Sequence, residues 1–137
     1  MSTFNLILDS EKSVEGNRTR ARFQIYKRMN VKKISLKFFG TNNNFTSSRA
    51  QDYILIDVTN PFNEDLIQSR TSSNKDGAFV IPYSTVATEI IYSEADFEQT
   101  IAGSGGELSD IWVQISHNDN STFTLDPWIM VLQITTD

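Results

Sequence analysis

Leu108-Ser-Asp-Ile-Trp-Val-Gln-Ile-Ser116 and Phe123-Thr-Leu-Asp-Pro-Trp-Ile-Met-Val-Leu-Gln-Ile134 decide the fold of this chain. The first stretch alternates apolar and polar residues after a one-residue change of phase near Asp110, and in the second Trp128, Met130, Leu132 and Ile134 share one parity. The segment between them is polar and rich in turn-forming residues: His117, Asn118, Asp119, Asn120 and Ser121. Alternation with a period of two residues predicts β-strands, and a turn between two such strands predicts a β-hairpin.

The rest of the chain repeats this pattern. Strands are expected over 4–8, 21–27, 31–39, 53–58, 78–83 and 86–92. The residues expected to face the core are Phe4, Leu6, Leu8, Phe23, Ile25, Ile34, Leu36 and Phe38. Pro82 marks its strand as an edge strand, because proline has no backbone donor. For 93–102 a short helix and a strand are both open, a helical turn is considered at 65–67, and 103–106 is expected to be a flexible connection.

This count gives eight or nine short strands and no long helix. Short strands separated by turn residues indicate an all-β sandwich or barrel. We therefore predict a single-domain β-sandwich over residues 1–137, a jelly roll of about eight antiparallel strands. An immunoglobulin-type sandwich has a similar number of strands, but its usual cysteine pair is absent here.

Composition narrows the classes of function. The chain has 137 residues, enough for one domain with a real core. It has no cysteine, which excludes disulfides, thiol catalysis and zinc–cysteine sites. The net charge of −5 argues against nucleic acid as a main partner, although nine of the twelve basic residues lie in the first 37 positions. No signal peptide or membrane-spanning run is expected, and folding is expected inside a cell.

Groups that could carry catalysis are few. His117 is the only histidine, and we expect it to be a solvated turn residue rather than part of a catalytic triad or a metal site. Asp52 and Asp57 have opposite parity on one strand, so they are expected on opposite faces. A calcium site among 94–98 is conceivable, but an exposed acidic face is the preferred interpretation. We predict no enzyme activity, no cofactor and no metal.

The aromatic residues suggest contacts instead. Trp112 has the opposite parity from its apolar neighbours, so we expect it to point outward, as a subunit contact or a sugar platform, or to pack under a loop. Trp128 shares the parity of the core residues and is predicted to be buried. The further candidates for subunit or ligand contact are Tyr53, Tyr92, Asn118, Asp119 and Asn120.

The two C-terminal strands, together with 53–58 and the segment from Asp76-Gly77 to Pro82-Tyr83, carry a resemblance. They resemble small jelly-roll structural proteins of double-stranded DNA viruses of the polinton, virophage and adenovirus-like lineages. In that group a "leucine-x-x-isoleucine-x-valine" strand, a turn and a "tryptophan-x-x-x-leucine-x-isoleucine" strand recur. The turn there often holds glycine, whereas this chain has Asn118-Asp119-Asn120. The resemblance implies a capsid or vertex component that forms symmetric rings, with no catalytic residues to transfer.

The leading hypothesis is therefore a non-enzymatic viral structural protein, a penton-like or minor capsid subunit. Its partners would be further copies of itself, as a trimer or pentamer, and other capsid proteins. It would be made in the host cytoplasm or nucleus and reside in the virion. The alternative is a carbohydrate- or receptor-binding module of a fibre or spike, and an enzyme is the third possibility. No membrane partner is expected in any of these cases.

Overall fold

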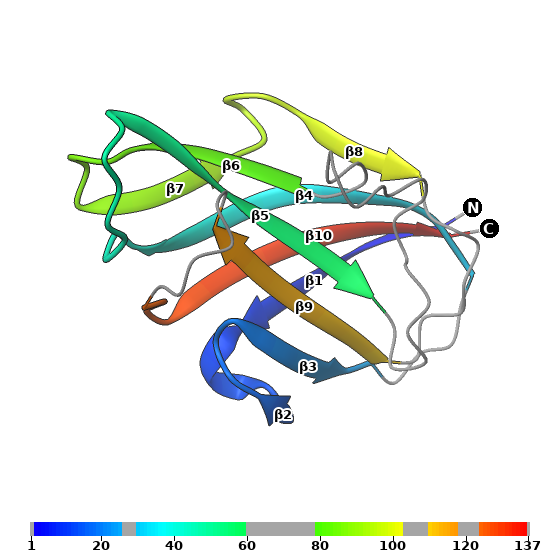
Figure 1. Cartoon of the computed structure of the whole chain (residues 1–137). Coiled ribbons are helices and arrows are strands. Elements are labelled where there is room, and N and C mark those ends of the chain that lie inside the picture. Colours follow the sequence, from blue (N-terminus) through cyan, green and yellow to red (C-terminus); the bar gives the residue numbers. More distant parts are fainter. Residues whose placement is uncertain (1, 26–29, 60–78, 103–109, 118–123, 137) are drawn as a thin grey trace.

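The computed structural model describes residues 2–25, 30–59, 79–102, 110–117 and 124–136 (Figure 1). Most of these residues lie in β-strands, and one short 3-10 turn follows the first strand. The elements are β1 (Ser2–Asp9), η1 (Ser10–Lys12), β2 (Glu15–Gly16), β3 (Arg20–Gln24), β4 (Val31–Asn42), β5 (Gln51–Thr59), β6 (Phe79–Ser84), β7 (Glu89–Ser93), β8 (Gln99–Ala102), β9 (Asp110–His117) and β10 (Trp128–Thr136). The expected turn at 65–67 and the connection at 103–106 lie outside these described residues.

The strands form two antiparallel sheets that pack face to face (Figure 1). Sheet I has the order β1-β10-β4-β7, and β8 also pairs with β4. Sheet II has the order β2-β3-β9-β5-β6. Without the short β2 and β8, the first and last strands are neighbours in sheet I, and the second and seventh are neighbours in sheet II. This is the strand order of a jelly roll, so the predicted all-β sandwich is confirmed. The predicted C-terminal β-hairpin is wrong, because β9 pairs with β3 and β5 in sheet II whereas β10 pairs with β1 and β4 in sheet I.

The core lies between the inner faces of the two sheets. Trp128 is 1% exposed and is the largest of the fully buried side chains. Its ring packs against Phe23 at 5.9 Å and Phe39 at 6.1 Å between centroids. The indole Nε1 donates to the Arg18 carbonyl at 2.8 Å, and the Trp128 backbone amide donates to Ser10 Oγ at 2.9 Å. The predicted inward position of Trp128 is therefore confirmed, and its one polar atom has a partner.

One of the predicted core positions on β4 is wrong. Val131 pairs with Phe38, but the next residue of β10 pairs with Leu36, so Lys37 is an extra residue in β4. Such a bulge reverses the alternation beyond it. Phe39 is consequently buried with 0% exposure, whereas Phe38, which we expected in the core, lies on the outer face.

The two sheets are joined by a side chain at the edge that Pro82 predicted. β6 ends sheet II, as expected for a proline-containing strand. The backbone amide of Val80 donates to Gln99 Oε1 at 2.8 Å, and Gln99 Nε2 donates to the Val80 carbonyl at 2.7 Å. Gln99 belongs to β8, the strand that the segment 93–102 forms after a turn. The Gln99 amide therefore links sheet I to the edge of sheet II.

Candidate functional site

Apolar side chains gather on the outer face of sheet I, which points away from the core. Ile7 on β1 pairs with Val131 on β10, and Val131 pairs with Phe38 on β4. In the neighbouring row, Ile129 pairs with Gly40, and Gly40 pairs with Ile91 on β7. Three of these side chains are strongly exposed: Ile7 at 75%, Ile91 at 57% and Ile129 at 47%. We call these five side chains the apolar stripe: Ile7, Phe38, Ile91, Ile129 and Val131.

A shallow hollow of about 320 Å³ opens in the stripe above Gly40. Ile91 and Ile129 line its sides, and Glu89 lies at its rim. A Cβ atom at position 40 would lie 3.0 Å from Cζ of Phe38, so the Phe38 ring lies close over this part of the strand. The absence of a side chain at Gly40 therefore gives the stripe its relief.

The outer face of sheet II carries Trp112, as its parity predicted. Its neighbours Ile111 and Val113 are buried, whereas Trp112 is half-buried. The Arg20 guanidinium lies 4.3 Å from the centroid of the Trp112 ring, in a cation–π arrangement. One ring face of Trp112 is thus already covered by the protein itself, which reduces the area left for a sugar.

The other predicted contact residues have different surroundings. Tyr53 is half-buried, and the Arg49 guanidinium lies 5.8 Å from its ring centroid. Tyr92 is 2% exposed, and its hydroxyl donates to the Phe97 carbonyl at 2.6 Å. Tyr92 therefore has no ring face to offer a ligand, because it belongs to the inner row of β7. Asn118, Asp119 and Asn120 lie outside the described residues.

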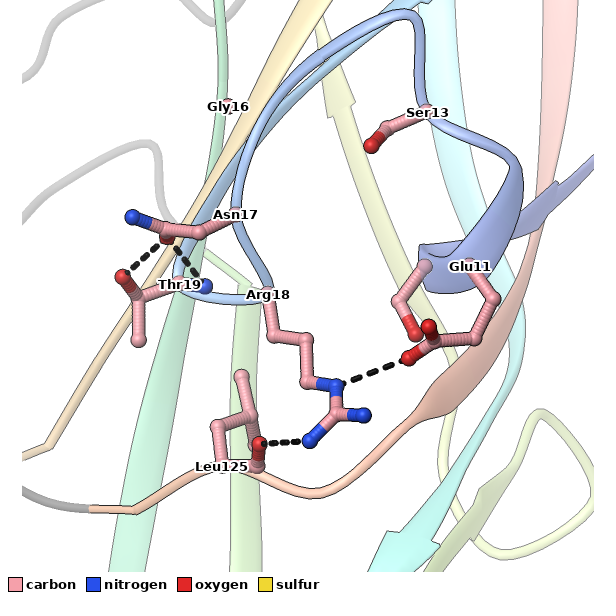
Figure 2. Close-up of a pocket in the computed structure, with 8 residues that line it drawn as sticks. Glu11, Ser13, Gly16, Asn17, Arg18, Thr19 and Leu125 are labelled. Atoms are coloured by element: carbon pink, nitrogen blue, oxygen red, sulfur yellow. Dashed lines mark hydrogen bonds and ion pairs between the residues drawn. The ribbon is translucent and has the colours of Figure 1, made fainter.

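A second hollow, of about 480 Å³, lies between η1 and the turn from β2 to β3 (Figure 2). Its lining is Ser10, Glu11, Ser13, Gly16, Asn17, Arg18, Thr19 and Leu125. Arg18 Nε bonds to Glu11 Oε1 at 2.7 Å, and Asn17 Oδ1 accepts from the amide and hydroxyl of Thr19 at 2.9 and 2.7 Å (Figure 2). Many of the polar groups that line this hollow are thus already hydrogen-bonded within the turn. The sequence did not single out this site.

His117 is not the solvated turn residue that we expected. It is 2% exposed at the end of β9, and its Nε2 lies 2.9 Å from the Tyr83 hydroxyl and 3.5 Å from Asp52 Oδ2. The expectation is wrong because β9 extends through residue 117, and the ring of Phe45, from the loop after β4, packs on the imidazole at 5.8 Å.

Asp52 is the centre of this buried polar group. Burial alone would raise the pKa of its carboxyl, but hydrogen bonds from Ser47, the Tyr53 amide and Arg49, with the charge of His117, hold the pKa below its usual value. The Ser47 hydroxyl donates to Asp52 Oδ2 at 2.5 Å. In a catalytic triad the serine hydroxyl is hydrogen-bonded to an imidazole nitrogen, whereas here the Ser47 hydroxyl is bonded to the carboxylate. The arrangement is therefore that of a structural hydrogen-bond network.

The acidic segment after β7 shows no convergence on a cation. Glu94 forms an ion pair with Lys37, the bulge residue of β4. Within the ranges that the structure describes, no three histidine, aspartate or glutamate side chains come together as a metal site would require. None of the helical structure in those ranges is long and apolar enough to cross a membrane.

Comparison with known proteins adds no family. No protein-family model matches the chain, and a search of curated sequences finds no match. Among solved structures, a CocE/NonD family hydrolase from Staphylococcus aureus is similar at a TM-score of 0.41 and 11% identity, over 99% of this chain but only 33% of the hydrolase. The Drosophila NLP core is similar at 0.28 and 10%, over 98% of this chain and all of that one.

The VP2 subviral particle of infectious bursal disease virus is similar at a TM-score of 0.27 and 11% identity, over 98% of this chain and 32% of VP2. The chain thus spans about a third of the hydrolase and of VP2. At these scores the likenesses carry no functional argument, and the function is argued below from the chain's own surfaces.

Proposed function

We propose that the protein is a non-enzymatic structural subunit of a viral capsid, a vertex or minor capsid protein that forms a symmetric homo-oligomer. The observation that carries the proposal is the apolar stripe on the outer face of sheet I. Three isoleucines that are 47–75% exposed lie on one regular face of this small sandwich. Apolar patches of this kind mark surfaces that another molecule covers, because burial of apolar area is favourable by about 25 cal/mol per Å².

The chemistry of the other surfaces supports a structural role. Ser10 and Ser13 line the hollow beside η1, whereas the sole histidine lies in the separate Asp52 network. The Ser47 hydroxyl is engaged by Asp52. The Ser10 hydroxyl oxygen accepts from the Trp128 amide at the start of β10, so both Ser10 and Ser47 make structural hydrogen bonds. The resemblance of the two C-terminal strands to small viral jelly-roll proteins supports the capsid, and hence the virion, as its location.

Light scattering coupled to size-exclusion chromatography, over a series of protein concentrations, tests this proposal. We expect a discrete symmetric oligomer, and the measured mass gives its number of copies. A strict monomer at the highest concentration would contradict it. Co-purification with the other capsid proteins from assembled virions would test the location.

A carbohydrate- or receptor-binding module is the second candidate. The Trp112–Arg20 stack supports it, because an exposed aromatic edge beside a guanidinium can contact a sugar or an acidic group. A glycan array with the oligomeric protein, and Trp112→Ala as the control variant, tests this candidate. Array signals no higher than background would exclude it for glycans.

A further inference from the structure

We propose that a second copy of this chain covers the apolar stripe face to face, with the two copies reversed along the strand direction. The proposal deepens the proposed function, on which it rests, by naming the surface through which copies meet. Three features support it: the apolar centre of the face, the opposite charges at its two ends, and its area.

The centre of the face is apolar and uneven. Ile7 projects at one side with 75% exposure, and the hollow above Gly40 lies at the other, between Ile91 and Ile129. Phe38 lines this hollow, and Val131 lies between Ile7 and Phe38 in one row of the sheet. These side chains supply apolar area at the centre of the contact, and in the reversed arrangement described below β1 of one copy lies opposite β1 of the other, so Ile7 does not enter the hollow.

The two ends of the face carry opposite charges. Glu89, paired across from Asn42, lies at the end of β4, and Asp9 lies in the adjacent row. Exposed Lys33 lies near the start of β4, in the row of Thr3 and Thr135. The nine residue steps from position 33 to 42 correspond to roughly 30 Å of strand. This exceeds the screening length of about 8 Å at physiological salt, so each end acts on its own.

These charges select one orientation. If two copies met with like ends together, Glu89 would approach its own counterpart, and like charges opposed at an interface are destabilising. Reversal brings Lys33 of one copy toward Glu89 of the other. A two-fold axis in the plane of the interface and perpendicular to the strands gives this arrangement. The contact is then isologous, so each interaction occurs twice.

The area of the face is suitable for a stable pair. Strands β1, β10 and β4 have 8, 9 and 12 residues, and β7 with 5 and β8 with 4 lie along the other side of β4. At a strand spacing of about 4.8 Å this face covers roughly 600 Å² before side-chain relief is counted. A specific interface takes about 800 Å² of accessible surface from each partner. The outer face of sheet I therefore comes close to a standard interface without help from loops.

The first experiment removes the apolar centre and measures mass by sedimentation velocity. Ile129→Glu places a charge in the stripe, and we expect the copies to separate, with the association constant reduced by at least about a hundredfold. Val86→Glu is the matched control, because Val86 is 88% exposed and lies outside the stripe. If Ile129→Glu does not fold, Ile91→Thr with Ile129→Thr keeps the β-branched side chains and removes apolar area.

The second experiment tests the orientation. Lys33→Glu or Glu89→Lys should each weaken association about fivefold, since one surface pair is altered twice, and the double variant should restore it. Failure to restore would overturn the reversed arrangement. A wild-type oligomer that Ile129→Glu leaves unchanged would overturn the stripe as the contact while sparing the proposed function. A monomeric wild type would overturn the proposed function itself.

Discussion

Two clusters with buried centres, one at the start of β10 and one at the end of β9, differ in their chemistry. The Trp128 cluster, formed by Trp128, Phe23 and Phe39, is apolar, and its one polar atom bonds to a backbone carbonyl. The Asp52 cluster, formed by Asp52, His117, Tyr83, Ser47 and Arg49, is polar and contains an ionisable group held in its charged form. The first is stabilised by the packing of large apolar side chains and the second by hydrogen bonds to a charged carboxylate. Truncation should therefore destabilise the first most, and only the contribution of the second to stability should depend on pH.

Trp128→Ala should have the largest effect. Truncation of a large buried aromatic residue costs about 3–5 kcal/mol, because the surrounding core does not fill the void. This is a large part of the roughly 5–15 kcal/mol that stabilises a domain. Urea unfolding followed by circular dichroism measures the loss. If Trp112→Ala proves more destabilising than Trp128→Ala, the assignment of inner and outer faces is wrong.

Asp52→Asn should cost less and depend on pH. The pKa of Asp52 is lowered in the fold, so its charge stabilises the native state fully above the ordinary pKa of 3.8. That contribution is lost as the pH falls through the lower folded-state pKa. Near neutral pH we expect a loss of about 1.5–3 kcal/mol, the usual value for hydrogen bonds to a charged group.

The difference in unfolding free energy between wild type and Asp52→Asn should narrow below pH 3.8. Trp128→Ala is the control, because its deficit should keep the same size across the titration. A constant Asp52→Asn deficit at all pH values would show that the charge of this cluster contributes nothing.

Gly16→Ala tests the turn that supports the Trp128 cluster. Gly16 has φ of 94°, and an added Cβ would lie 2.0 Å from the Arg20 carbonyl oxygen. Moving this backbone should cost about 1–3 kcal/mol and disturb the Arg18 carbonyl that accepts the Trp128 indole. Gly40→Ala is the matched control, since there the added Cβ meets only the Phe38 side chain at 3.0 Å. Equal thermal shifts in the two variants would contradict this reasoning.

Trp112→Ala should have the smallest effect on stability and serves as the reference outside both clusters. The loss of the cation–π contact with Arg20 should cost about 0.5–1 kcal/mol. A double-mutant cycle with Arg20→Gln isolates that contact. A coupling energy indistinguishable from zero would show that the stack does not stabilise the fold.

The apolar cluster was predictable from the sequence, and the polar one was not. The parity of Trp128 and Met130 identifies the inner face of β10 because alternation follows directly from strand geometry. Parity fails at Phe38, because a bulge is set by packing across the sheet rather than by local composition. The apolar stripe escaped prediction for a related reason: Ile7, Ile91 and Ile129 become neighbours only through the strand order.

His117 and Tyr92 show another limit. His117 stands beside a polar turn in the sequence, yet Phe45, more than seventy positions earlier, packs on its ring. Tyr92 was expected to be a contact residue, but it lies between two outward positions of β7 and points inward. The burial of these side chains depends on contacts with residues that are distant in sequence. Such contacts cannot be predicted from local composition.

The Gln99 amide has a consequence for aggregation. An exposed edge strand offers unpaired donors and acceptors to any foreign strand. At the β6 edge, Val80 already has a side chain in the place of a neighbouring strand, and Pro82 has no donor to offer. These two features keep further strands from pairing with β6. Strand addition of that kind is what leads to fibrils. An assembly of this protein can then grow through its faces while its β6 edge resists uncontrolled polymerisation.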